Sequence, residues 1–86
     1  MGDAAIWERV KELLSFHSGA PPSGITPASS PQNTPGWDSV ANLGLMCAIE
    51  DEYGITVATR DVMRLRTLGD IAAYVEENRG KTAAGG

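Results

Sequence analysis

The residues with the clearest chemical potential are Asp38 and Ser39, which lie where a proline-rich stretch gives way to a helical pattern. Both residue types are favoured at a helix N-cap, so Ser39 could simply be the cap. A serine in the first helical turn is also exposed, and the unpaired N–H groups and helix dipole there favour an attached phosphate. Asp38 would then be the better cap. On these residues alone, a helix cap and a modification site are both open interpretations.

A third interpretation, in which Ser39 is the nucleophile of a hydrolase, finds little support. Such a serine needs a base and an acid that orients the base, and the only histidine, His17, falls at the far end of another predicted helix. The local run is Gly-Trp-Asp-Ser-Val, not the Gly-x-Ser-x-Gly of a nucleophile elbow. One histidine and one cysteine, Cys47, are too few for a protein metal site. We therefore expect no catalytic residue and no metal.

The composition excludes several other classes of protein. A chain of 86 residues is one domain. Its formal net charge of -4 argues against binding to nucleic acid or to anionic membranes, which need a basic surface. A single cysteine excludes an internal disulfide, no apolar run approaches a membrane span, and no signal peptide is recognisable. We expect a monomer in the cytoplasm.

The first helix is expected to start after Asp3, a suitable N-cap, and to end near His17 or Ser18, where Gly19 stops it. One face of this helix carries apolar residues at a spacing of three to four, closed by the histidine. These residues are Ile6, Val10, Leu13, Leu14 and His17.

A long loop at residues 18–37 holds all five prolines. Its main apolar anchor before Trp37 is Ile25, and its other residues are expected to bury little surface. Connections of this length usually have a function or are disordered.

The central helix starts at Asp38 or Ser39 and should end at Gly54, a good C′ residue, with Ile55 making the apolar contact of a Schellman motif. A short helix is expected to begin at Thr59 or Asp61 and run through Arg64, with residues 62 and 65 facing inward. Three arginines surround this short helix and either form a solvated face or pair with the acidic residues 50–52. They are Arg60, Arg64 and Arg66.

The last helix should begin at Thr67 and Asp70, which have the spacing of a weaker, aspartate-bearing capping box. Its apolar stripe consists of Leu68, Ile71, Ala72 and Val75. Gly80 is expected to end it, which divides the chain into a folded domain at residues 1–80 and a disordered tail at residues 81–86. The whole predicts an all-α small four-helix bundle, with three main helices, one short helix and a long first loop.

The central helix has two apolar faces, one more than the core of so small a domain requires. At 3.6 residues per turn, Leu45, Met46, Ile49 and Tyr53 gather on the face assigned to the core. The second face consists of Val40, Leu43 and Cys47, with Gly44 between the two faces and Asp51 below. Either the long loop covers this second face or a partner binds it.

The run from Gly36 to Tyr53, Gly-Trp-Asp-Ser-Val-Ala-Asn-Leu-Gly-Leu-Met-Cys-Ala-Ile-Glu-Asp-Glu-Tyr, resembles the modification-site helix of acyl carrier proteins. In that family an Asp-Ser pair opens the second helix, and the serine carries a phosphopantetheine arm. The resemblance extends over residues 4–79. It implies the same helical bundle, with Ser39 as the point of covalent attachment and Asp38 beside it.

The resemblance implies a stand-alone acyl carrier protein that is not an enzyme. A phosphopantetheinyl transferase would supply 4'-phosphopantetheine from coenzyme A, and the thiol of this group would hold acyl or aminoacyl thioesters for loading and synthase enzymes. Enzymes of the family dock beside the serine, which makes the matching residues candidate contacts: Val40, Leu43, Gly44, Cys47, Glu50 and Asp51. The alternative is a non-catalytic helical interaction module in which Ser39 is only a cap.

The sequence departs from the family at three positions. Members that serve fatty-acid synthesis carry acidic residues early in this helix, where this chain has Ala41 and Gly44, and Trp37 replaces a small residue. We therefore expect a specialised polyketide, lipid or peptide pathway. We also expect an exposed Gly44, whose missing side chain lets a partner approach.

Overall fold

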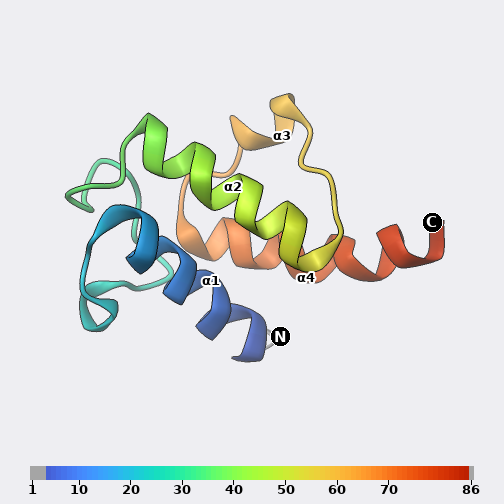
Figure 1. Cartoon of the computed structure of the whole chain (residues 1–86), viewed down its shortest axis with the longest axis horizontal. Coiled ribbons are helices and arrows are strands. Elements are labelled where there is room, and N and C mark those ends of the chain that lie inside the picture. The colour runs from blue at the N-terminus through green and yellow to red at the C-terminus, as the bar shows by residue number, and fades with distance from the viewer. Residues whose placement is uncertain (1–3, 86) are drawn as a thin grey trace.

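Four α-helices and one 3-10 turn form the computed structural model, which describes residues 4–85, with side chains from residue 4 to residue 78. In chain order these elements are α1 (Ala4–Ser18), η1 (Pro22–Gly24), α2 (Ser39–Tyr53), α3 (Thr59–Val62) and α4 (Leu68–Gly85). Figure 1 shows α1, α2 and α4 gathered into one bundle, with the short α3 at its margin beyond α2. The predicted all-α bundle with a long first loop is confirmed.

Local capping explains where the helices begin and end. Gly19 adopts a φ of 81° after α1, and its N–H donates to the Ser15 carbonyl at 2.8 Å. Gly54 likewise ends α2 with a φ of 65°, a conformation in which glycine carries no steric penalty. The capping box of α4 is confirmed: Asp70 Oδ2 accepts from the Thr67 N–H at 3.2 Å, and Thr67 Oγ1 accepts from the Asp70 N–H at 3.1 Å.

Other helix ends differ from the prediction. The expected N-cap of α1, Asp3, lies outside the described residues. Helix α3 ends at Val62 and not at Arg64. Helix α4 continues beyond Gly80 to Gly85, so the expected end at Gly80 is wrong. One glycine inside a helix costs only about 1 kcal/mol, and the following Lys-Thr-Ala-Ala run can continue the helix. The division at residue 80 into domain and tail stays a prediction.

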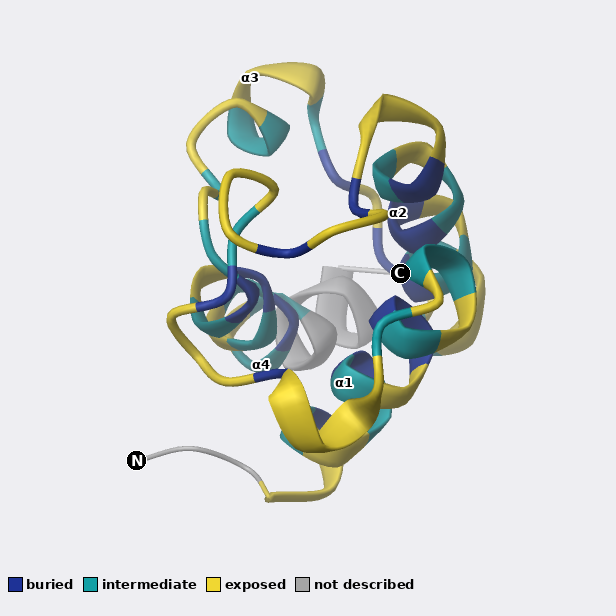
Figure 2. Ribbon diagram, turned by 90° about the vertical axis from the view of Figure 1, so that its left-hand side faces the viewer, coloured by how far each residue is buried: buried dark blue, intermediate teal, exposed yellow. Residues whose placement is uncertain are grey.

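The core lies between α1, α2 and α4, whose buried faces point toward one another in Figure 2. The predicted stripes of α1 and α4 are confirmed, with His17 and Ala72 half-buried at their edges. The side chains with the least exposure are Ile6, Val10, Leu14, Leu45, Ile49, Leu68, Ile71 and Val75. Of the residues described, no helix is both long and apolar enough to cross a membrane.

The loop between α1 and α2 packs on the bundle. Ile25 is buried as expected. Ser29 and Thr34 are also buried, which the sequence did not predict, whereas most of the other loop residues are exposed, as expected. These polar groups can leave water because they bond within the loop: Ser29 Oγ accepts from the Thr26 N–H at 2.9 Å. The loop therefore packs against the bundle at these residues.

Two backbone contacts fasten this loop to α4. The Leu68 N–H donates to the Ser29 carbonyl, and the Gly69 N–H donates to the Pro27 carbonyl, both at 2.9 Å. These are the unpaired N–H groups of the first turn of α4, which the loop satisfies in place of water.

Candidate modification site at the start of α2

Ser39 is the first residue of α2 and is exposed. The preceding Asp38 has an extended backbone, and its Oδ1 atom accepts from the Ala41 N–H at 2.9 Å. Asp38 is therefore the N-cap, and Ser39 is not. Within the described part of the chain, no hydrogen-bond partner holds the Ser39 hydroxyl, so this hydroxyl is available to an external group.

Trp37 fixes the position of this helix start. Its side chain is only 3% exposed, and its Nε1–H donates to Asn42 Oδ1 at 3.0 Å. One residue earlier, Gly36 has a φ of 90° and passes so close to the Ser18 carbonyl that a Cβ would clash with it. The indole thus ties the residue before Asp38 to the first turn of α2, a role that the sequence did not reveal.

The second apolar face of α2 is open. Val40 is 79% exposed and Leu43 is 67% exposed, and Cys47 and Asp51 are exposed as well. The long loop therefore does not cover this face. On the opposite face the predicted core assignment is confirmed, since Leu45, Met46 and Ile49 are buried and Tyr53 is half-buried.

Gly44 is not exposed as expected, because α1 crosses α2 at this residue. It is half-buried, and a Cβ there would lie 2.7 Å from His17 Nδ1. Ala41 is also turned inward and is 6% exposed. The two positions at which fatty-acid members of the family were expected to carry acidic residues therefore face the interior here.

The acidic residues at the end of α2 serve different purposes. Glu50 is half-buried, and its Oε2 atom accepts from the Val57 N–H at 2.8 Å, which fixes the connection to α3. Glu52 accepts two parallel hydrogen bonds from Arg9 of α1, at 3.0 Å and 2.9 Å. The sequence does not reveal this pair, because 43 positions separate its members.

The arginine cluster gives one ion pair among the described residues, between Arg64 and Asp61 at 3.8 Å. Of the two alternatives that the sequence left open, the described residues show no ion pair between the cluster and residues 50–52. Arg60 and Arg66 are exposed.

A shallow groove of about 470 Å³ lies beside the candidate site, between the long loop, α2 and the segment that contains α3. Asn42 contributes the α2 wall, and residues at the same helical spacing as Ser39 and Asn42 are neighbours on a helix surface. A group attached to Ser39 can therefore reach this groove. Its lining residues are Pro31, Gln32, Asn42, Val62, Met63, Leu65 and Arg66.

Residues 8–75 match the sequence profile of the family described as "Phosphopantetheine attachment site". The chain belongs to this phosphopantetheine-binding family, and within it to the acyl carrier proteins. It is 32% identical over 68 residues to the meromycolate extension acyl carrier proteins of Mycobacterium bovis and Mycobacterium tuberculosis. That alignment includes 79% of this chain, and the chain spans 59% of the length of those relatives.

The meromycolate extension acyl carrier protein of Mycolicibacterium aurum is 34% identical over 66 residues, an alignment that includes 77% of this chain and 68% of that protein. The geometry at Ser39 fits the family's cofactor, 4'-phosphopantetheine. The hydroxyl is exposed, it has no competing partner in the described residues, and it lies at the positive end of the α2 dipole, where a phosphate is favoured.

Proposed function

We propose that Ser39 is the residue to which phosphopantetheine is attached. The observation that carries this proposal is the division of labour between Asp38, which caps α2, and Ser39, whose exposed hydroxyl is unused. In the reaction, Ser39 Oγ forms a bond to the phosphorus that bears the pantetheine part of coenzyme A. The hydroxyl proton passes to a base of the transferase, and the adenosine bisphosphate leaves.

The attached group supplies a terminal thiol that can hold an acyl or aminoacyl chain as a thioester. The chain's own residues present that thioester to loading and synthase enzymes and catalyse no step. Tethering raises the effective concentration of the cargo at each enzyme. We further infer that the protein acts as a monomer in the cytoplasm.

The surface proposed for these partners is the open face of α2. Val40, Leu43 and Cys47 supply apolar contact area, and Asp51 supplies an exposed charge. Glu50 remains a candidate through its second carboxylate oxygen, since the first holds the Val57 N–H. Gly44 would act indirectly, by allowing α1 to approach α2.

A specialised lipid pathway is the setting that the relatives favour, ahead of a polyketide or peptide pathway, because their names refer to meromycolate extension. The inward positions of Ala41 and Gly44 agree with a role outside bulk fatty-acid synthesis. For this chain, a lipid cargo and partner enzymes of such a pathway are proposed from its similarity to these relatives.

Intact mass spectrometry tests the attachment. Incubation with coenzyme A and a promiscuous phosphopantetheinyl transferase should add one phosphopantetheine to the wild-type chain. Ser39→Ala should remain unmodified with the same helical circular dichroism, whereas Ser23→Ala, which changes an exposed serine in η1, should be modified fully. A wild-type chain that stays unmodified beside a modified control carrier would support a plain helical interaction module instead.

A further inference from the structure

The segment that leads into α2 is fixed before the helix begins. Residues 34–37 form a turn, which the Trp37 N–H closes by donating to the Thr34 carbonyl at 3.1 Å. Pro35 is the second residue of this turn and Gly36, with a φ of 90°, is the third, which is the residue pattern of a type II turn. Trp37 is therefore held by its backbone, while its side chain lies in the core with only 3% exposure.

Trp37 is also bound to the helix that follows it. Its Nε1–H donates to Asn42 Oδ1 at 3.0 Å, and the Asn42 N–H donates to the Asp38 carbonyl at 2.8 Å. Asn42 therefore holds both residues that precede Ser39, one through its side chain and one through its backbone. Ser39 is thus enclosed between bonded points of the chain, while its own hydroxyl has no hydrogen-bond partner among the described residues.

Trp37 and Asn42 occupy two special positions at the start of a helix. Because Asp38 is the N-cap, Trp37 is the residue before the cap and Asn42 is the fourth residue of the helix. Hydrophobic side chains at these two positions often pack together and fix the angle at which the chain enters the helix. Here a hydrogen bond between an indole and an amide takes the place of the apolar contact. We call this pair the staple.

The simplest interpretation of the staple is that a buried indole N–H needs an acceptor. Its location also ties it to the reaction at Ser39. One residue separates Trp37 from Ser39, and Asn42 lies about one helical turn after Ser39, on the same side of α2. In phosphoryl transfer the attacking and leaving oxygens lie roughly in line. A misplacement of about 1 Å can lower the rate of an enzymatic reaction by ~100-fold.

We propose that the staple sets the orientation of the first turn of α2, and with it the direction in which Ser39 presents its hydroxyl to the transferase. Trp37 and Asn42 are then positioning residues, because neither side chain takes part in the bond change at phosphorus. Trp37 is buried, so in the folded chain it acts through the backbone and through Asn42. The kinetic role of the staple rests on the proposed function of Ser39, whereas the staple itself is a property of the unmodified chain.

The kinetics of the transfer test this role. Trp37→Phe keeps an aromatic ring in the core but removes the N–H, and Asn42→Ala removes the acceptor. With coenzyme A and a promiscuous transferase, each variant should lower kcat roughly three- to tenfold, as expected for the loss of one hydrogen bond. The KM for the carrier should stay unchanged, because the surface that the transferase binds is retained. The double variant should lose no more than the single variants, since all of them remove the same bond.

Three results would overturn the proposal. An unchanged kcat in both single variants would show that the bond does not affect the reaction. Losses that multiply in the double variant would show that the two side chains act separately. A higher KM with an unchanged kcat in Asn42→Ala would make the half-buried amide a contact of the transferase instead of a positioning group. All variants are compared at a temperature at which circular dichroism shows them folded.

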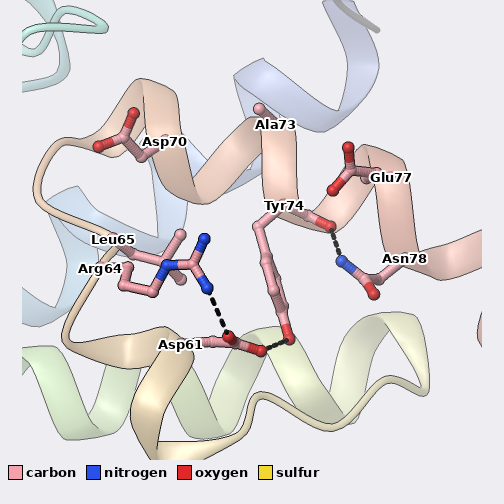
Figure 3. A pocket seen from close by; sticks show the side chains of 8 residues that line it. All are labelled: Asp61, Arg64, Leu65, Asp70, Ala73, Tyr74, Glu77 and Asn78. Atoms are coloured by element: carbon pink, nitrogen blue, oxygen red, sulfur yellow. Dashed lines mark hydrogen bonds and ion pairs between the residues drawn. The ribbon is translucent and has the colours of Figure 1, made fainter.

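The matched control removes a similar bond elsewhere in the chain. The Tyr74 hydroxyl donates to Asp61 Oδ2 at 3.0 Å, as the sticks in Figure 3 show, and Tyr74 is half-buried. Tyr74→Phe thus takes an aromatic donor from a side-chain acceptor, as Trp37→Phe does, but in a pocket between α4 and the segment that contains α3. This variant should keep the parental kcat. A loss as large as that of Trp37→Phe would contradict a specific staple.

A measurement without the transferase separates this inference from the proposed function. In Asn42→Ala, the backbone order parameters of residues 38–40 from NMR relaxation should fall below the parental values, whereas those of residues 68–75 in α4 should not change. Unchanged order at residues 38–40 would overturn the staple even where Ser39 is modified. A wild-type chain that stays unmodified would instead contradict the proposed function, and the order parameters would still decide on the staple.

Discussion

The imidazole of His17 occupies the space that a side chain at Gly44 would need. A Cβ at residue 44 would lie 2.7 Å from Nδ1 and 2.9 Å from Cε1, both closer than Cβ atoms are found to other atoms. The glycine in the middle of α2 is thus explained by the close crossing of α1. The same ring meets Phe16 edge-on, with 5.1 Å between the ring centroids.

Substitution at Gly44 should therefore be governed by His17. Alanine in a helix is favoured over glycine by about 0.5–1 kcal/mol, but in Gly44→Ala the displacement of the imidazole should cancel or exceed this gain. We expect a melting temperature no higher than wild type. In a His17→Ala background the same substitution should raise it. Thermal melts of the wild type, the two single variants and the double variant give the energetic coupling between the two positions. A melting temperature of Gly44→Ala above that of the wild type would contradict the close approach of His17 to Gly44.

The two glycines that flank the long loop offer a matched pair for measuring its attachment to α1. Gly19 and Gly36 both have positive φ angles, of 81° and 90°, but only Gly36 is enclosed, by the Ser18 carbonyl. Gly19→Ala should cost about 1 kcal/mol of backbone strain, and Gly36→Ala should cost clearly more. Denaturant unfolding measures the difference, and equal losses would show that the loop can move away from Ser18.

Asp38 should matter for stability through its cap, which asparagine can also provide. Asp38→Ala should lower the free energy of unfolding by about 0.5–2 kcal/mol, whereas Asp38→Asn should change it little. Comparing transferase rates for the two variants at a temperature where both are folded separates the cap from the charge. If Asp38→Asn is as unstable as Asp38→Ala, the bond to the Ala41 N–H is not the source of the stabilisation.

Tyr74 should titrate late. Burial raises the pKa of Tyr74 above its usual value of 10.0, and the hydrogen bond to Asp61 raises it further. The pKa of Tyr74 is higher in the folded chain than in the unfolded chain, so the protonated Tyr74 hydroxyl contributes to the stability of the fold. This contribution is complete below pH 10 and is lost as pH rises through the folded pKa. Tyrosinate absorbance in a Tyr53→Phe variant, which leaves Tyr74 as the only tyrosine, should show a midpoint above 10.0. Asp61→Asn should lower that midpoint, and a midpoint of 10.0 or less in the Tyr53→Phe variant would contradict the environment described.

The features predicted correctly depend on residues close together in the sequence. The cap at Asp38 and the box at Thr67 and Asp70 act within one helical turn, and the core stripes follow the helical period. The errors arise where distant segments meet. The inward position of Gly44 depends on where α1 crosses α2. The burial of Ser29 depends on the packing of the loop beside α4, where the Leu68 N–H donates to the Ser29 carbonyl.

The attachments of the long loop have a consequence for the minimal substrate of a modifying enzyme. The stretch that leads into Ser39 rests on the end of α1 at Ser18 and on the first turn of α4 at Leu68. A peptide that contains only α2 and Asp38 would keep the Asp-Ser pair and its cap, but it would lose the contacts with α1 and α4 that position the preceding loop. We therefore expect a peptide of α2 alone to be a poorer substrate of a transferase than the folded domain.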